Sequence, residues 1–295
     1  MRKLIIVTGG AGFVGSNLIE YLLKKTKYKI LSIDNYSTGL KKNHFQNNRI
    51  KYIKADTNNI YNILSKYKNK IKVLFHFGEF ARIHQSFYNI KECFNSNIAG
   101  TAKVFSFCLD NKIKIIYSAT SASLGNKGSD QSLSPYAYSK SRNLKLLIHL
   151  KKWFNLSYEA LYFYNVYGPR QIKTGSMATV IGIFENQYKN KKSITVVKPG
   201  SQSRKFTHIQ DTIHGCYYAW KKNLNRHYSL SNSKAYSILE VAKMFSTKVK
   251  FIKPRLGERK KSSIVKNIGK LKIYNVPCRS NLKTYIQIFK YNHNK

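Results

Sequence analysis

The N-terminal stretch constrains the fold of this chain more than any other part. Residues 4–7, Leu-Ile-Ile-Val, form a short apolar run, and residues 9–15, Gly-Gly-Ala-Gly-Phe-Val-Gly, follow after one threonine. Apolar residues then recur at helical spacing, at Leu18, Ile19 and Leu22. This pattern predicts a buried strand, a tight turn and an amphipathic helix.

The three glycines have the spacing of a dinucleotide-binding turn. Gly9 permits the tight turn, Gly12 lets the backbone approach a pyrophosphate, and Gly15 lets the helix pack on the strand. The N-terminus of the helix would face the phosphates. A second apolar strand, residues 30–33, ends in Asp34 about 20 residues later. Because this carboxylate would bind an adenosine ribose and repel a 2′-phosphate, we expect NAD rather than NADP. The alternative is a glycine turn without a ligand.

Further apolar runs alternate with helical patterns along the chain. Residues 50–56, 73–78 and 113–118 read as strands, which predicts an α/β fold with a doubly wound parallel sheet of the Rossmann type. Ligands then belong beyond the carboxyl ends of the strands. Asp56 ends the third strand, where it would bind the adenine amino group or cap the helix that begins at Thr57.

A tyrosine and a lysine share one face of a later helix. Ser134 and Pro135 open this helix, and Tyr136 and Lys140 follow four residues apart. A tyrosine has a pKa near 10, and lowering it by about 3 units needs roughly 4 kcal/mol of preferential stabilisation of the phenolate. A nearby ammonium and a positive nicotinamide ring would supply it. Alternatively, Tyr136 only packs and Lys140 is a solvated charge.

The order of these motifs resembles that of the extended short-chain dehydrogenase/reductase family. Within this family, the chain resembles the nucleotide-sugar epimerases typified by UDP-glucose 4-epimerase. The similarity spans roughly residues 1 to 285. Its motifs are Thr-Gly-Gly-Ala-Gly-Phe-Val-Gly at 8–15, the acid at 34, Ser-Ala-Thr at 118–120, Tyr136 with Lys140, Tyr-Phe-Tyr-Asn-Val-Tyr-Gly-Pro-Arg-Gln at 162–171, and Arg-Lys-Phe-Thr-His-Ile-Gln-Asp at 204–211.

The resemblance implies a role for individual residues. Tyr136 would be the catalytic base and acid, Lys140 its electrostatic partner and a ligand of the nicotinamide ribose, and Thr120 the hydroxyl that binds the sugar oxygen. With Thr120, the substrate-binding residues would be Asn165, Arg204 and Arg255; paired arginines suit phosphate oxygens. The cofactor-binding residues would be Gly9, Gly12, Phe13, Val14, Gly15, Asp34, Asn35, Asp56, Phe77, Gly78, Asn97, Tyr136 and Lys140.

The implied activity is NAD-dependent epimerisation of a nucleotide sugar at C4, with a UDP-sugar as substrate and a transient 4-keto intermediate. A dehydratase, decarboxylase or keto-reductase on the same scaffold is the alternative. Dehydratases of the family typically follow the threonine with Asp-Glu, whereas this chain has Ser121 and Ala122. Further departures, which bear on the sugar, are Glu79 in place of a small residue, Lys205 in place of an aspartate and Leu124 in place of an aromatic residue.

The chain divides into two parts by pattern. Residues 1–170 are expected to form the NAD-binding domain, with a return segment near 206–245, and 171–295 mainly a smaller α/β substrate domain. Residues 177–188 read as a helix and 193–197 as a strand of the second part. No linker separates the two, so they should share a cleft.

The composition limits the other classes of function. The chain has 295 residues, 42% of them hydrophobic, which is ample for a core. The net charge of +41 comes from lysines spread over every segment, together with abundant Asn, Ile and Tyr, whose codons are rich in A and T. Compositional drift explains this pattern at least as well as an anionic partner does, and we expect no specific nucleic-acid partner. A non-catalytic polyanion-binding protein is the alternative, against which the set of Thr120, Tyr136 and Lys140 argues.

Location and assembly follow from weaker signals. No apolar run approaches a membrane span, and the N-terminus lacks a signal-peptide pattern. The four cysteines have no paired spacing, which favours a reducing, cytoplasmic compartment and no metal site. The resemblance implies a homodimer through helices near residues 91–108 and 140–154. Its apolar positions would be Phe94, Val104, Leu144, Leu147 and Ile148.

Overall fold

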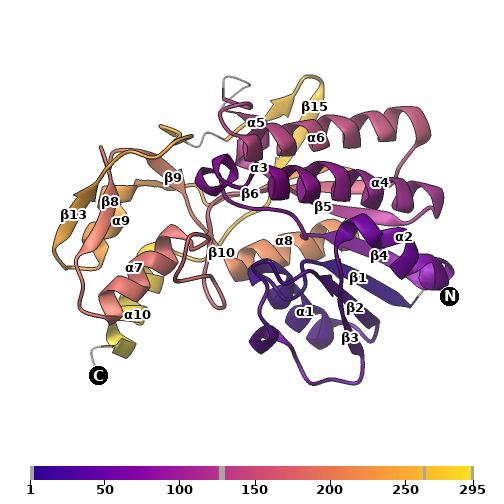
Figure 1. Ribbon diagram of the computed structural model, residues 1–295, viewed down its shortest axis with the longest axis horizontal. Coiled ribbons are helices and arrows are strands. Elements are labelled where there is room, and N and C mark those ends of the chain that lie inside the picture. The colour runs from indigo at the N-terminus through magenta and orange to yellow at the C-terminus, as the bar shows by residue number, and fades with distance from the viewer. Residues whose placement is uncertain (1–2, 126–129, 262–263, 294–295) are drawn as a thin grey trace.

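A nine-stranded sheet lies at the centre of the computed structural model, which describes residues 3–125, 130–261 and 264–293 (Figure 1). The strand order is β14-β15-β11-β6-β5-β4-β1-β2-β3, and only the β14–β15 pair is antiparallel. The strands are β1 (Leu4–Thr8), β2 (Lys29–Asp34), β3 (Ile50–Lys54), β4 (Ile71–His76), β5 (Lys114–Thr120), β6 (Tyr158–Phe163), β11 (His227–Leu230), β14 (Asn267–Ile268) and β15 (Leu271–Asn275). The order reverses between β1 and β4, so the predicted doubly wound sheet is confirmed.

The glycine turn joins β1 to helix α1 (Phe13–Lys25) as the sequence predicts. Gly9 has a φ of 70°, a conformation that other residues rarely adopt. A Cβ at Gly15 would lie 2.1 Å from the carbonyl oxygen of Gly9, so the helix can approach the turn only without a side chain there. Residues 9 and 15 therefore have to be glycines for this strand and helix to pack.

Helices cover both faces of the sheet (Figure 1). Leu64, Val104 and Leu147 belong to the apolar cluster on one face, and Leu18 and Ile213 to the cluster on the other. The helices of the first face are α2 (Ile60–Leu64), α4 (Thr101–Asp110) and α6 (Pro135–Phe154), and those of the second are α1 and α8 (Ile209–Lys222). Shorter segments are η1 (Lys41–Asn43), η2 (Thr57–Asn59), η3 (Ser65–Lys70), η4 (His84–Phe87), α3 (Ile90–Phe94), η5 (Asn95–Gly100) and α5 (Ser121–Leu124).

The apolar faces of α4 and α6 are largely occupied within the chain. Val104, Leu144 and Leu147 are at most 3% exposed and pack in the apolar cluster between these helices and the sheet. Phe94 and Ile148 are partly buried. Three of the five positions expected at a dimer interface are therefore core residues, because an amphipathic helix buries its apolar stripe against its own sheet first. The homodimer itself remains a prediction.

A smaller lobe has its own apolar cluster, which includes Phe184, Val196, Val241 and Ile286. Its elements are α7 (Val180–Lys189), β8 (Ile194–Val197), α9 (Ile238–Met244), β13 (Val249–Ile252) and α10 (Leu282–His293). Among the described residues, three two-stranded sheets lie outside the large sheet. They pair β7 (Val166–Tyr167) with β10 (Thr207–His208), β9 (Ser203–Lys205) with β12 (Ala235–Ser237), and β8 with β13. The predicted helix at 177–188 and strand at 193–197 are present, although the helix begins three residues later than predicted, after its cap Thr179.

The chain crosses between the two parts more often than the sequence suggested. It returns to the large sheet with α8 and β11, as expected near residues 206–245, but α9 packs in the smaller lobe. A second return adds β14 and β15. The boundaries at 170 and 171 remain a prediction. In the described ranges, no helix combines the length and apolar character that a membrane crossing requires.

A buried ion pair joins two neighbouring strands of the sheet. Lys114 Nζ lies 2.7 Å from Glu159 Oε1, with side chains 9% and 0% exposed. The Glu159 carboxylate also accepts hydrogen bonds from the backbone N–H groups of Asn225 and Arg226, at 2.9 and 2.6 Å. Burial lowers the pKa of Lys114, and the carboxylate opposes that shift. Lys114 thus depends on the Glu159 carboxylate to remain charged in the core.

We predict that Glu159→Ala lowers the free energy of unfolding by about 3 to 5 kcal/mol, because it leaves a buried ammonium without its counter-ion and two backbone donors without their acceptor. Urea unfolding would measure the loss. As the control, Lys24→Ala removes a partner of the exposed Glu20 pair and should cost less than about 1 kcal/mol. A loss for Glu159→Ala no larger than that of the control would contradict the prediction.

Candidate active site

A cleft of about 490 Å³ opens at the carboxyl ends of the sheet strands and extends to the smaller lobe. It is bordered by the glycine turn, the ends of β2 to β5, the start of α7 and residues 255–259. The predicted site residues that line it are Gly9, Gly12, Phe13, Val14, Gly15, Asp34, Asn35, Asp56, Phe77, Gly78, Thr120, Tyr136, Lys140, Asn165, Arg204 and Arg255. Of the predicted set, only Asn97 is absent from the cleft wall.

The glycine turn and Asp34 form one end of the cleft. Helix α1 begins after Gly12, which has no side chain to cap the first N–H groups, so these groups suit a phosphate. Asp34 is 7% exposed and accepts hydrogen bonds from the backbone N–H groups of Ala11 and Tyr36, at 2.9 and 2.8 Å. Burial raises the pKa of Asp34, and the backbone donors oppose the rise. This cradle fits a dinucleotide with a free 2′-hydroxyl.

Asp56 fulfils the capping role that the sequence left open. Its carboxylate accepts the N–H of Asn58 at 2.8 Å and caps η2, and it also accepts a hydrogen bond from Asn35 Nδ2 at 3.1 Å. Asp56 lines the cleft at the same time. A contact with adenine is compatible with capping and remains a prediction.

Asn97 supports the cleft from behind. It is fully buried; its Oδ1 accepts the Phe80 N–H at 2.6 Å, and its Nδ2 donates to the Phe80 carbonyl and to Ser139 Oγ, both at 3.1 Å. The sequence analysis expected a cofactor contact here. In the structure the amide instead binds the segment after β4 and Ser139 of α6, and the cofactor contact remains a prediction.

The three proposed catalytic side chains converge at the end of β5. Thr120 Oγ1 accepts the N–H of Ala122 at 3.3 Å, and its hydroxyl lowers the pKa of the Tyr136 phenol. The backbone N–H of Tyr136 donates to Ser86 Oγ at 3.1 Å, so η4 is attached to the start of α6. Burial and the negative Glu79 raise the pKa of Tyr136 to about 12, while Thr120 and Arg82 lower it.

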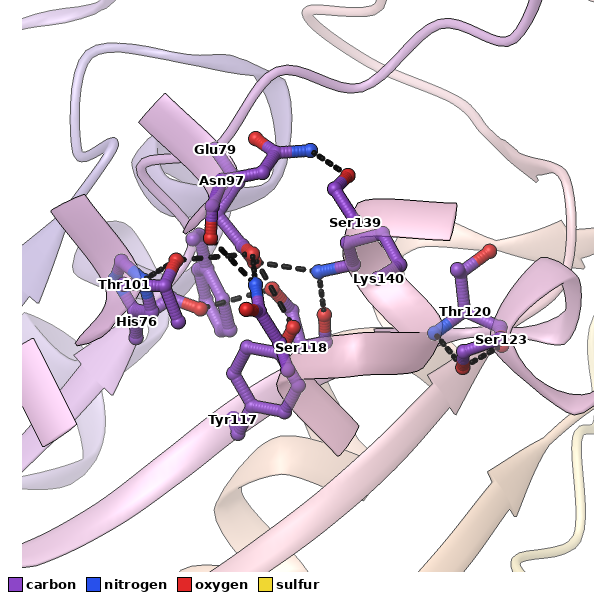
Figure 2. A network of polar contacts seen from close by, with 12 residues as sticks. His76, Glu79, Asn97, Thr101, Tyr117, Ser118, Thr120, Ser123, Ser139 and Lys140 are labelled. Carbon is purple, nitrogen blue, oxygen red and sulfur yellow. Dashed lines mark hydrogen bonds and ion pairs between the residues drawn. The ribbon is translucent and has the colours of Figure 1, made fainter. Parts of the chain in front are cut away.

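Lys140 is bound inside a polar network (Figure 2). Its Nζ donates to the Glu79 carboxylate and to the Ser118 carbonyl, the latter at 2.5 Å. The Glu79 carboxylate also accepts hydrogen bonds from Thr101 Oγ1 at 3.1 Å, and from Tyr117 OH and Asn143 Nδ2, each at 3.2 Å. Burial lowers the pKa of Lys140, and Glu79 opposes that shift. The sequence singled out Glu79 only as a departure from the family.

Arg82 is a cleft residue that the sequence analysis missed. Its Nε donates to the Met177 carbonyl and its Nη1 to the Ala81 carbonyl, each at 2.7 Å. In the described part of the chain, no carboxylate forms an ion pair with it, in contrast to the ion-paired Arg204. Burial lowers the pKa of Arg82, and Tyr136 opposes that shift. Its place just beyond the carboxyl end of β4 was the available signal.

The far end of the cleft carries the proposed phosphate-binding residues. Arg204 Nη2 lies 2.8 Å from Glu258 Oε1, and Arg255 is exposed. Asn165 Nδ2 donates to the Lys205 carbonyl at 2.9 Å, which fixes the strand that carries Arg204. Arg259 also lines the cleft, although the sequence analysis did not name it. Both predicted arginines thus reach the same end of the cleft.

Comparison with known proteins places the chain in a family. Residues 5–231 match the NAD dependent epimerase/dehydratase family. The chain is 31% identical over 258 residues to ADP-L-glycero-D-manno-heptose-6-epimerase of Brachyspira hyodysenteriae, which covers 81% of this chain and 79% of the relative. This extent of similarity confirms the predicted family and its NAD dependence.

Solved structures agree over nearly the whole length. UDP-N-acetylglucosamine 4-epimerase of Methanobrevibacter ruminantium has a TM-score of 0.84 at 26% identity and covers 99% of this chain and 97% of its own. UDP-glucuronic acid 4-epimerase of Bacillus cereus, solved with UDP-glucuronic acid and NAD, has a TM-score of 0.84 at 26% identity and covers 99% of both chains. The chain with its glycine turn, Tyr136 and Lys140 therefore belongs to the NAD-dependent epimerase/dehydratase family.

Proposed function

We propose that this protein epimerises a nucleotide sugar at C4 through a transient 4-keto sugar. The observation that carries the proposal is the convergence of Thr120, Tyr136 and Lys140 in a cleft that also holds the glycine turn. A base beside a dinucleotide cradle is what reversible oxidation of a sugar hydroxyl requires. NAD supplies the hydride acceptor for the oxidation and the donor for the return.

Tyr136 acts as the base in the oxidation and as the acid in the reduction. Its phenolate oxygen takes the proton of the C4 hydroxyl as the carbon–oxygen bond becomes a carbonyl, and its phenol returns that proton when the opposite face of the ketone is reduced. Thr120 holds the same oxygen in both states through its hydroxyl. Both side chains line the cleft, so their oxygens can bind the same substrate hydroxyl.

The arginines at the far end determine the class of substrate. Arg204 and Arg255 line the same cleft as Thr120, and guanidinium groups match phosphate oxygens, which supports binding of a pyrophosphate there. We propose a UDP-sugar as the substrate, since the two similar 4-epimerases are named for UDP-sugars. The similar 6-epimerase is named for an ADP-heptose, so the position of the inverted carbon is what the experiment has to establish.

The dehydratase alternative lacks its acid and base groups. Ser121 and Ala122 stand where a dehydratase needs two acids, and both are buried at the start of α5, at 8% and 2% exposed. Neither side chain can transfer protons to the sugar. A keto-reductase would use the same site but release oxidised cofactor. Incubation with UDP-, ADP- and GDP-sugars, followed by product analysis and measurement of free NAD, tests the proposal. An epimer formed without net cofactor turnover supports it, and an unsaturated or reduced sugar contradicts it.

We also propose a homodimer in a reducing, cytoplasmic compartment. All four cysteines are free thiols, which suits that compartment. Trp153 and Phe154 end α6 with 58% and 59% exposure, so this helix still offers apolar surface to a second subunit. Light scattering at micromolar concentration measures the assembly, and a monomer would contradict the dimer.

We predict that Tyr136→Phe lowers kcat by about 10² to 10⁴, the usual contribution of a general acid or base. The ring keeps its packing, so NAD affinity should change little. Turnover assays with titration calorimetry of NAD separate the two effects. More than about a tenth of wild-type activity, far outside that range, would contradict the assignment and make Tyr138 the next residue to test.

We predict tighter binding of NAD than of NADP, and a weaker preference in Asp34→Ser. The carboxylate accepts from the ribose hydroxyls and repels a 2′-phosphate, whereas serine does neither as strongly. Calorimetric affinities for both cofactors in both proteins measure the ratio. As the control, Glu258→Gln removes a negative charge at the other end of the cleft and should leave the ratio unchanged. A wild-type preference for NADP would contradict the prediction.

A further inference from the structure

One wall of the cleft is an irregular segment between β7 and α7. Residues 168–179, all of them described, lie outside any helix or strand, and Ile172 and residues 177–181 line the cleft. Residues 173–176, at the tip of the segment, are exposed. Because no strand ladder holds the segment, its shape depends on the contacts that its side chains make.

Thr179 and Gln171 close the base of this segment. Thr179 Oγ1 donates to Gln171 Oε1 at 2.8 Å, and the Thr179 N–H donates to the Ile172 carbonyl at 3.0 Å. The same Thr179 oxygen accepts the N–H of Gly182 at 3.0 Å and so caps α7. A Cβ at Gly182 would lie 2.4 Å from the Ile172 carbonyl oxygen, so the base packs directly against the first turn of the helix. Residues 172–179 therefore form a closed loop that stands on the start of α7.

A buried carboxylate holds the base of this loop from within the smaller lobe. Glu185 of α7 is 1% exposed, and its Oε1 accepts hydrogen bonds from Gln171 Nε2 at 2.9 Å and from Tyr285 OH at 2.6 Å. Its Oε2 lies 2.8 Å from Lys173 Nζ, whose side chain is 47% exposed. Burial and Glu185 raise the pKa of Tyr285, so the phenol stays protonated and donates. Because Tyr285 belongs to α10, which lies beside α7 (Figure 1), Glu185 joins the loop to both helices.

The proposed proton transfers use neither Glu185 nor Gln171. A carboxylate buried this deeply is unfavourable unless several donors satisfy it. The Gln171 amide has both of its polar atoms occupied, one by Glu185 and the other by Thr179. Without Glu185, this buried amide and the Tyr285 phenol would each lack an acceptor, which is costly. Release of the exposed loop is the readiest way for water to reach them.

We propose that Glu185 is a positioning residue for the nucleotide sugar, because it holds the loop 172–179 in the shape that binds this substrate. The inference rests on the proposed function, since it requires a nucleotide sugar in the cleft. It assigns part of the substrate affinity to a side chain that does not itself line the cleft. Other elements, the glycine turn and the end of β2, form the NAD cradle. Glu185 should therefore affect the affinity for the nucleotide and leave that for NAD unchanged.

The first test compares Glu185→Ala with Glu185→Gln. Titration calorimetry measures the Kd of NAD and of whichever of UDP, ADP and GDP binds the wild type most tightly. Hydrogen exchange followed by mass spectrometry measures the opening of residues 172–179 without any ligand. Loss of the acceptor of two buried donors corresponds to about a tenfold effect or more. Glu185→Ala should weaken nucleotide binding and speed exchange of the loop by about that factor, and raise KM for the sugar more than it lowers kcat.

Glu185→Gln is the conservative variant. Its amide oxygen still accepts from Gln171 and Tyr285, and the lost ion pair with the exposed Lys173 is worth little. Nucleotide affinity and loop exchange should therefore stay near the wild-type values. A loss as large as that of Glu185→Ala would contradict the role of these two hydrogen bonds.

Exchange of the amide and the carboxylate tests the contact itself. Gln171→Glu places two carboxylates against each other and should reproduce the loss expected of Glu185→Ala. The double variant Gln171→Glu/Glu185→Gln again sets an amide donor against a carboxylate and leaves acceptors for Thr179 and Tyr285. Recovery in the double variant is the coupling that two residues in contact show. A double variant no better than Gln171→Glu would overturn the inference.

Gln187→Ala is the matched control. Gln187 lies on the same helix, forms two hydrogen bonds with Thr195, at 2.8 and 3.1 Å, and does not line the cleft. Its loss should lower the melting temperature without changing nucleotide affinity or exchange of the loop. If Glu185→Ala behaved in the same way, or weakened nucleotide and NAD binding equally, its role would be structural and the inference wrong.

Failure of the proposed function gives a different result. If no sugar is epimerised while nucleotide affinity depends on Glu185 as expected, the reaction is wrong and the positioning role stands. If a sugar is epimerised with a KM that does not depend on Glu185, the inference fails and the function stands. Absence of binding by all three nucleotides would overturn both.

Discussion

The close approach of the chain at the ends of β1 and β4 is the constraint on which the site depends. A Cβ at Gly9 would lie 2.7 Å from the backbone of Phe77, so the glycine turn and the end of β4 are in direct contact. Thr8 Oγ1 accepts the N–H groups of Phe77 and Gly78 at 3.2 and 3.1 Å and lies 2.7 Å from His76 Nδ1. The strand order reverses at this point, and the cleft begins there. The turn that carries Glu79 and Arg82 is therefore placed by the same packing that forms the cofactor cradle.

A buried ion pair beside a base has a chemical consequence beyond its stability. Removing one member of such a pair leaves an uncompensated charge in the core, so Lys140 and Glu79 have to be considered together. As a pair they hold α6 against the segment after β4 and, through the Ser118 carbonyl, against β5. Since burial raises the pKa of the Tyr136 phenol, positive charge has to offset the rise if Tyr136 is to accept a proton near neutral pH. The Lys140 ammonium and the positive nicotinamide ring of bound NAD would supply that charge together.

The sequence predicted the parts that depend on periodic patterns and fixed spacing. The glycine turn, the parallel strands, Ser134 as the cap of α6 and the smaller lobe follow from local rules that tertiary contacts do not override. Directions of single side chains do not follow from such rules. Asn97 binds Phe80 and Ser139 and does not line the cleft, and Val104, Leu144 and Leu147 pack in the core against the sheet. Arg82 could be identified as a cleft residue only from the structure, because it lies in an irregular segment after β4.

The distribution of acids connects the excess of lysine with the site. The chain has 12 acidic residues against 53 lysines and arginines, and eleven of the twelve accept a hydrogen bond or form an ion pair with a described group. Asp34 and Asp56 lie at the cofactor end of the cleft, Glu258 at the phosphate end, and Glu159 in the sheet. Random drift toward lysine would remove acids on the surface first, where their loss costs little. Acids that remain mark positions where a negative charge is used, and Glu79 is one of them: its place against Lys140 is part of how the site works.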